Sequence, residues 1–103
     1  MTKEGIEHPL EQGAATSLIR EMAQDASATR VFTGHARQRM EERQVPADWV
    51  DHVLREGSVE LVRHENGSWR YRVSHVDQWG RTAVVTAIPA PRKLVIVTVT
   101  RSE

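Results

Sequence analysis

The residues best suited to chemistry lie within residues 33–43, which read Thr-Gly-His-Ala-Arg-Gln-Arg-Met-Glu-Glu-Arg. In a helix of about 100° per residue, His35, Arg39 and Arg43 form one stripe beside an apolar one. The two arginines are like charges one turn apart, and basic residues crowd the positive first half of the helix. Free amides at a helix N-terminus attract anions. We therefore hypothesise a phosphate site, in which His35 transfers a proton and the arginines hold the anion.

A purely structural interpretation of the same segment is simpler. In it, His35 caps the helix, and the two arginines pair with carboxylates such as those of Glu42, Asp48 or Asp51. Ion-pair networks of this kind are common in proteins, so the residue types alone favour this interpretation. The two interpretations differ in whether these side chains already have partners within the fold.

A second group of basic residues follows from a predicted hairpin. Asn66-Gly67 separates two segments of alternating side chains, and Asn-Gly between strands is the strongest short hairpin signal. Centring the turn on this pair places Arg63 opposite Arg70 and puts Arg72 on the same face. Opposed like charges destabilise a hairpin unless an anion or a carboxylate lies between them. The pairing therefore predicts an anion-binding face.

Hydroxyl groups interleaved with these arginines suit contacts to phosphate. Thr98, in the last predicted strand, is the residue that we assign to this face together with Arg63, Arg70 and Arg72. The alternative is a solvated polar face that is neutralised by Glu60 or by the acidic N-terminal segment. The sequence supports the two interpretations equally.

Hydrophobic periodicity predicts the elements that position these groups. We expect three helices and five strands, at residues 9–26 (helix), 30–33 (short strand), 34–44 and 47–56 (helices), and 59–64, 69–76, 82–88 and 94–100 (strands). This order predicts an α+β fold in which N-terminal helices pack on a four-stranded, mainly antiparallel sheet. We divide the chain into a tail and helix over residues 1–29 and an α+β domain over residues 30–103, together one compact unit.

Strand alternation predicts which face of the sheet the helices cover. It assigns Val85 and Val97 to that covered face. Trp49, Val53 and Leu54 form the apolar stripe of the helix at 47–56, and we expect the helix to bury them against Val85 and Val97.

Composition restricts the chemistry further. The chain has 103 residues, enough for one domain with a modest core, and it contains no cysteine. Disulfides, thiolate nucleophiles and cysteine-based zinc sites are thereby excluded, and a cytosolic location is favoured. The histidines lack the spacing of metal ligands, so we expect neither a metal nor a cofactor. The N-terminus lacks the apolar run of a signal peptide or a membrane span.

The balance of charge counts against a dedicated nucleic-acid binder, because 14 basic residues match 14 acidic ones. The charges are partly segregated, however. Acidic residues are frequent in the first quarter of the chain, whereas arginines are frequent in its strand-rich second half. One basic face is therefore compatible with a net charge of zero.

Residues 33–45 resemble the signature of an uncharacterised bacterial family of small proteins, T-x-H-A-x-x-R-M-x-x-R-x-I, with Val45 in the final position. The segments around Gly57, 67–72 and 95–99 fit the layout of the same family. That family looks like an outlying branch of the RelE/ParE-like toxin superfamily, which includes the BrnT-type toxins.

The resemblance implies a compact sheet packed by two helices, metal-independent RNA cleavage of the mRNA interferase type, and an antitoxin-like protein partner. It points to His35, Arg39 and Arg43 as catalytic residues, with Arg70 and Arg72 on the sheet. The first functional hypothesis is therefore a toxin-like ribonuclease or RNA-binding module, with ribosome-bound message among its candidate substrates. The alternative is a non-enzymatic module of the same fold that binds a protein target or cognate partner.

Overall fold

The hairpin predicted at Asn66-Gly67 is present in the computed structural model, which describes residues 6–78 and 80–102. The hairpin consists of β2 (Ser58–Glu65) and β3 (Ser68–Asp77). Asn66 and Gly67 have φ angles of 50° and 80°, the left-handed conformation that a type I′ hairpin turn requires. Arg63 lies opposite Arg70, so the predicted register is confirmed.

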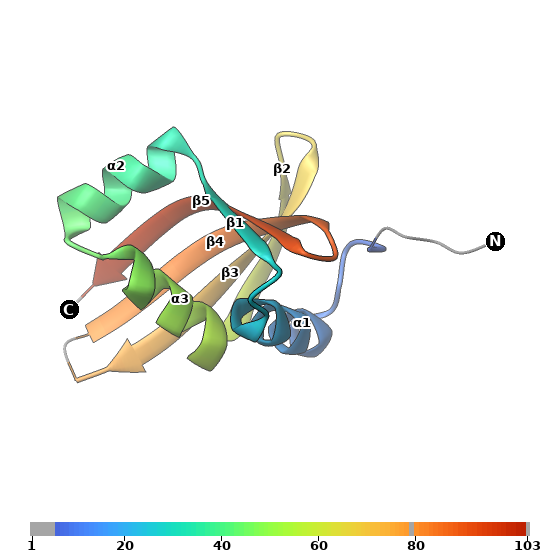
Figure 1. Cartoon of the computed structure of the whole chain (residues 1–103), viewed down its shortest axis with the longest axis horizontal. Coiled ribbons are helices and arrows are strands. Elements are labelled where there is room, and N and C mark those ends of the chain that lie inside the picture. The colour runs from blue at the N-terminus through green and yellow to red at the C-terminus, as the bar shows by residue number, and fades with distance from the viewer. Residues whose placement is uncertain (1–5, 79, 103) are drawn as a thin grey trace.

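Five strands form one sheet in the order β1-β5-β4-β3-β2 (Figure 1). The other three strands are β1 (Thr29–Phe32), β4 (Gly80–Ala90) and β5 (Lys93–Ser102). The four long strands pair antiparallel, as predicted, but β1 joins β5 in parallel. The sheet is therefore mixed and has five strands, and the prediction of four is wrong. Periodicity cannot reveal this pairing, because the partner of β1 lies at the far end of the chain.

The three helices follow the predicted order, with the bounds α1 (Gln12–Gln24), α2 (Gly34–Arg43) and α3 (Ala47–Glu56). The bounds of α3 are those predicted. α1 is shorter than predicted because it begins after Glu11, whose carboxylate accepts a hydrogen bond from the Ala14 N–H at 2.7 Å. Pro9 therefore lies before the helix and not in its first turn.

Part of the predicted tail is a packed segment. Residues 1–5 lie outside the described residues, but Ile6 and Leu10 pack against the core. The Tyr71 hydroxyl lies 2.6 Å from Nδ1 of His8 and accepts a hydrogen bond from the Leu10 N–H at 2.9 Å. Residues 6–11 are thereby attached to the middle of β3.

The helices divide the sheet into two unlike faces. α1 and α3 lie side by side on one face, where α1 contacts β2 and α3 contacts β3 and β4 (Figure 1). α2 lies along β5, beyond the end of β1. We call the face with α1 and α3 the covered face, and the opposite one the open face.

The predicted covered face is correct for β3 and wrong for β4. Tyr71 pairs with Thr86 and Val73 with Val84, so these four buried side chains share the covered face. Each odd-numbered residue of β3 pairs with an even-numbered residue of β4. The alternation of side chains in β4 is therefore shifted by one position relative to the prediction. Val85 consequently lies on the open face.

A bulge changes the alternation again in β5. Val85 pairs with Thr98, but Thr86 pairs with Ile96, so Val97 is an extra residue and is only half-buried. The predicted packing of α3 against Val85 and Val97 is therefore wrong. Val53 and Leu54 are fully buried, as predicted, and they belong to the hydrophobic core under the helices. Trp49 is half-buried and packs against that core.

Gly57 is required where α3 passes into β2. It caps the C-terminus of α3 in an extended conformation, with φ −82° and ψ −178°. A Cβ atom at this position would lie 2.5 Å from the Ser74 carbonyl oxygen and 2.6 Å from that of Val53. Close approach of the backbone of β3, and not a left-handed turn, thus explains the glycine.

Candidate functional site

The four residues predicted to bind phosphate all lie on the open face. Arg63 and Arg70 are opposite one another, and Arg72 lies opposite Val85, which in turn lies opposite Thr98. Directly opposed residues of antiparallel strands point to the same face. Arg72 and Thr98 are two strands apart, roughly 10 Å at the usual strand spacing. The sheet therefore brings Arg63, Arg70, Arg72 and Thr98 together.

Acidic residues neutralise only part of this positive charge. Glu60 pairs with Arg72 at 3.0 Å and also with Arg81. Glu65 lies 3.9 Å from Arg70, at the limit of an ion pair. Four arginines and two glutamates leave a net charge of +2 on this part of the open face, and Arg63 has no acidic partner among the described residues. The structural alternative, full neutralisation by Glu60 or by the N-terminal segment, is thus only partly realised.

A small pocket of about 60 Å³ lies among these side chains. Its lining comes from β2, β3 and β4, namely Leu61, Arg63, Glu65, Arg70, Arg72 and Val85. Within the described part of the chain, the Nε of Arg70 is buried and has no hydrogen-bond partner. The pocket has room for about two water molecules, so it fits the oxygens of one phosphate and not a base.

Glu60 is held in its ionised form. Partial burial raises the pKa of Glu60, but hydrogen bonds from Arg81 and Ser74, with the charges of Arg81 and Arg72, outweigh that effect. The pKa of Glu60 therefore lies below its ordinary value. Ser74 donates from its hydroxyl at 2.9 Å. Glu60 thus competes with any external anion for Arg72 and Arg81.

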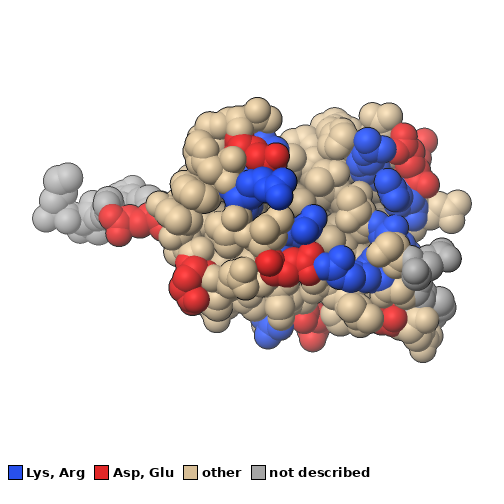
Figure 2. Space-filling view, turned by 180° about the vertical axis from the view of Figure 1, so that it is seen from behind, with Lys and Arg blue, Asp and Glu red and all other residues tan. Residues whose placement is uncertain are grey.

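Basic side chains are concentrated in two regions when the molecule is seen from the open face. Figure 2 shows Lys and Arg side chains across the middle of this face, with Asp and Glu atoms among them, and further Lys and Arg side chains toward the side where α2 lies. The residues that pair with one another or with the arginines across neighbouring strands of this face have small side chains, for example Val85, Ala87 and Val95. An extended polyanion could follow the face from one group to the other.

Thr33, and not His35, caps α2. The Thr33 hydroxyl accepts a hydrogen bond from the Ala36 N–H at 3.0 Å and donates to the Val97 carbonyl at 3.2 Å. The structural interpretation of His35 as a cap is therefore wrong. The His35 side chain is exposed and makes no hydrogen bond within the described residues.

The arginines of α2 are only partly paired. Arg39 forms an ion pair with Glu42 at 2.9 Å. Arg43 is exposed and has no acidic partner in the described part of the chain. Asp51, one of the expected partners, pairs instead with Arg30 at 2.6 Å. The structural interpretation of α2 therefore does not account for the charge of Arg43, and the functional interpretation stays a prediction.

The two groups of predicted site residues do not share a pocket. The pocket at Arg70 is lined by β2, β3 and β4, and α2 contributes no residue to it. α2 contacts β5, which β4 separates from β3. Thr98 on β5 lies between the two groups. A single ligand that contacts both must therefore be long.

Sequence reasoning missed Arg81 as a member of the basic face. Its side chain reaches Glu60, which lies at a bulge in β2. The available signal was the alternation of β4, where Arg81 shares a face with Val85. It could be used only if the register between β3 and β4 was known.

Two other properties of the described residues bear on function. They contain no cluster of three or more side chains that could hold a metal ion. No described helix is long and apolar enough to cross a membrane.

Residues 32–101 match the family described as "Domain of unknown function (DUF4258)". The chain belongs to this family. The match covers more than half of the chain, from the end of β1 almost to the end of β5, and thus includes both groups of site residues. No curated protein and no solved structure matches the chain. The similarity to RelE-like toxins stays a prediction.

Proposed function

We propose that this DUF4258 protein binds RNA through the sugar-phosphate backbone, on the open face of its sheet. The observation that supports the proposal is the row formed by Arg63, Arg70 and Arg72, which internal carboxylates only partly neutralise. Such a concentration of guanidinium groups is costly without an anion, because like charges directly opposed across a hairpin repel.

The proposed binding relies on phosphate contacts more than on bases. The rows that cross the open face at Arg70 and Arg72 contain no aromatic side chain among the described residues. Sheets that read single-stranded RNA by sequence use such rings to stack bases. Arg63 and Arg70 would hold one phosphate, and the Thr98 hydroxyl would donate to another. Binding would be weakly dependent on sequence and strongly dependent on salt.

The test is a salt titration with a fluorescently labelled single-stranded RNA. Replacing Arg63 and Arg70 by alanine should weaken binding by about tenfold or more, and the slope of log K against log salt should become shallower by about 1.4. Arg55→Ala is the control for loss of an arginine away from the open face, because Arg55 lies on α3 over the covered face. Unchanged affinity of the double variant, or an equal loss in the control, would overturn the proposal.

Cleavage of the bound RNA is a second candidate function, and the position of His35 favours it. His35 lies exposed in the first turn of α2, where a histidine with no structural hydrogen bond can exchange protons with a ligand. It would take the 2′-hydroxyl proton as that oxygen attacks the adjacent phosphate, or protonate the departing 5′-oxygen. Arg39 and Arg43 would stabilise the charge that develops on the phosphate. A toxin-like protein of this kind needs no metal.

Two single variants separate catalysis from stability at this site. His35→Ala should abolish RNA cleavage in the presence of EDTA and leave the melting temperature unchanged. Thr33→Ala removes the helix cap, so it should cost about 1 kcal/mol of stability while cleavage per folded molecule persists. An active His35→Ala protein would end the catalytic assignment. If wild-type protein binds RNA without cutting it, only the binding proposal survives.

A further inference from the structure

β2 forms one edge of the sheet, and only its first part is protected. The Val59 N–H donates to the Thr16 hydroxyl at 2.9 Å, and the Gln12 side chain donates to the Glu60 carbonyl at 3.3 Å. Both partners belong to α1. Beyond Glu60, no described residue caps the outer side of the strand. An edge of this kind is a template for another strand.

The hairpin geometry identifies the backbone groups that face outward. Glu65 and Ser68 flank the two-residue turn, so they form the hydrogen-bonded pair next to it. Inward and outward groups then alternate along an antiparallel strand. The N–H and C=O groups of Val62 and His64 consequently point away from the sheet, and they offer four hydrogen bonds to an added strand.

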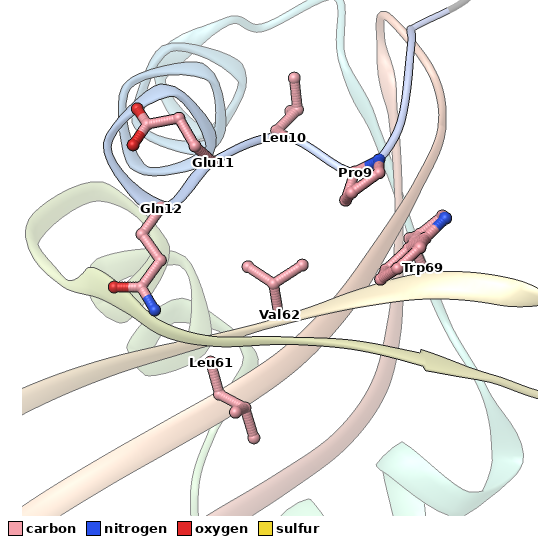
Figure 3. A pocket seen from close by; sticks show the side chains of 7 residues that line it. All are labelled: Pro9, Leu10, Glu11, Gln12, Leu61, Val62 and Trp69. Atoms are coloured by element: carbon pink, nitrogen blue, oxygen red, sulfur yellow. The ribbon is translucent and has the colours of Figure 1, made fainter.

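A groove of about 670 Å³ lies beside this edge. Figure 3 shows Pro9 and Leu10 on one side of it and Val62 and Trp69 on the other; the Leu10 side chain points away from Val62, and Leu61 points to the opposite side of β2. Val62, Leu10 and Trp69 are half-buried, so apolar surface stays accessible there. The groove can accept apolar side chains from a strand placed next to β2.

The wall of the groove is fixed by hydrogen bonds to the core. The Tyr71 hydroxyl is fully buried and contacts both His8 and the Leu10 N–H. His8 Nε2 donates to the Ile88 carbonyl at 3.0 Å, so Nδ1 of the neutral ring accepts from Tyr71. The segment that carries Pro9 and Leu10 is thereby held in place before any ligand binds, which lowers the entropic cost of binding.

The other side of β2 is basic. Arg63 has no acidic partner among the described residues, and its cross-strand neighbour is Arg70. A residue placed opposite Arg63 by an added strand would have its Cβ about 5 Å from that of Arg63. An acidic side chain at this position would neutralise the exposed guanidinium.

We propose that an extended peptide of a partner protein adds to β2 as a sixth strand, and that its side chains alternate between apolar and acidic. The apolar ones enter the groove between Leu10 and Trp69, and the acidic ones face Arg63. This mode of recognition draws affinity from the backbone and specificity from alternate side chains. It goes beyond RNA binding, because it concerns the edge of β2 and not the open face. A second copy of the chain is a poorer occupant, since antiparallel pairing centred on Arg63 would oppose two arginines.

The test uses the full chain and two peptides of about nine residues, long enough to span the edge at ~3.3 Å per residue. One alternates valine with glutamate, and the matched control alternates valine with lysine. The glutamate peptide should bind about tenfold more tightly and slow amide hydrogen exchange at Val62 and His64 by about tenfold or more. Arg63→Glu should reverse the preference, whereas Arg55→Glu on α3 should not.

Three outcomes would overturn the inference. Equal binding of the lysine peptide would remove the role of Arg63. Binding of the glutamate peptide without slower exchange at Val62 and His64 would place it on the open face as a simple polyanion. Slower exchange that depends on protein concentration alone would make a second copy of the chain the occupant. The exchange measurement on wild-type protein decides the matter even if the Arg63 variant fails to fold.

Discussion

Replacing Glu60 with glutamine should strengthen RNA binding while weakening the fold. Glu60 is the carboxylate shared by Arg72 and Arg81, so the change raises the net charge of the open face from +2 to +3 and frees both guanidiniums. One additional charged contact is worth about 1 kcal/mol near the surface, or roughly fivefold in affinity. Contact with one or two more phosphates should make the salt slope steeper by about 0.7 to 1.4.

The same variant should lose about 1 kcal/mol of stability, because partly exposed ion pairs contribute little and glutamine retains one acceptor for Ser74. For a domain of this size, the melting temperature would fall by about 4–8 °C. A gain in RNA affinity together with a loss of stability is the distinguishing result, because general damage to the fold would lower both quantities.

Fluorescence anisotropy with labelled single-stranded RNA measures the affinity, and calorimetry measures the melting temperature. Glu21→Gln is the matched control, because it changes the total charge equally but lies exposed on α1, on the covered face. If both variants shift affinity by the same factor, total charge and not the Glu60 contact is responsible. If Glu60→Gln leaves affinity and salt slope unchanged, the arginines of the open face do not contact RNA.

Three further predictions concern stability. The pKa of Glu60 is lowered in the fold, so its stabilisation is present above the ordinary value of 4.5 and is lost as the pH falls through the lowered value. The gap in melting temperature between wild type and Glu60→Gln should therefore close progressively as the pH is lowered below about 4.5. Gly57→Ala should cost about 1–3 kcal/mol in urea unfolding, because its Cβ would lie 2.5 Å from a carbonyl oxygen of β3, whereas Gly34→Ala, with open space around it, should cost nothing. Tyr71→Phe removes the hydroxyl that holds residues 6–11, so it should cost about 1–3 kcal/mol of stability and weaken binding of the glutamate peptide. An unchanged melting temperature would contradict the role of this network.

The sequence alone determined the features that depend on neighbouring residues. The Asn66-Gly67 turn defined the hairpin and its register, because a type I′ turn tolerates few other residue pairs. The opposition of Arg63 and Arg70 followed directly. The helical period and its break at Gly57 defined α3 to the residue. Local signals of this kind act over a few positions and do not require knowledge of the tertiary structure.

Only the tertiary structure decided how distant segments meet. β1 pairs with β5 across most of the chain, and the connection from β3 to β4 and the bulge at Val97 decide which side chains of β4 and β5 face the helices. A shift of one residue reverses a strand completely, so the faces of β4 and β5 could not be predicted from alternation.

The candidate site shows the same division. The arginines of the hairpin were predictable, whereas the pairing of Glu60 with Arg81, 21 residues away, depends on a bulge in β2. The attachment of residues 6–11 to Tyr71 likewise joins positions more than 60 residues apart, and it creates a groove that no local pattern indicates. Contacts of this range form only when the whole sheet is assembled, because their energy depends on the packing of every strand between them.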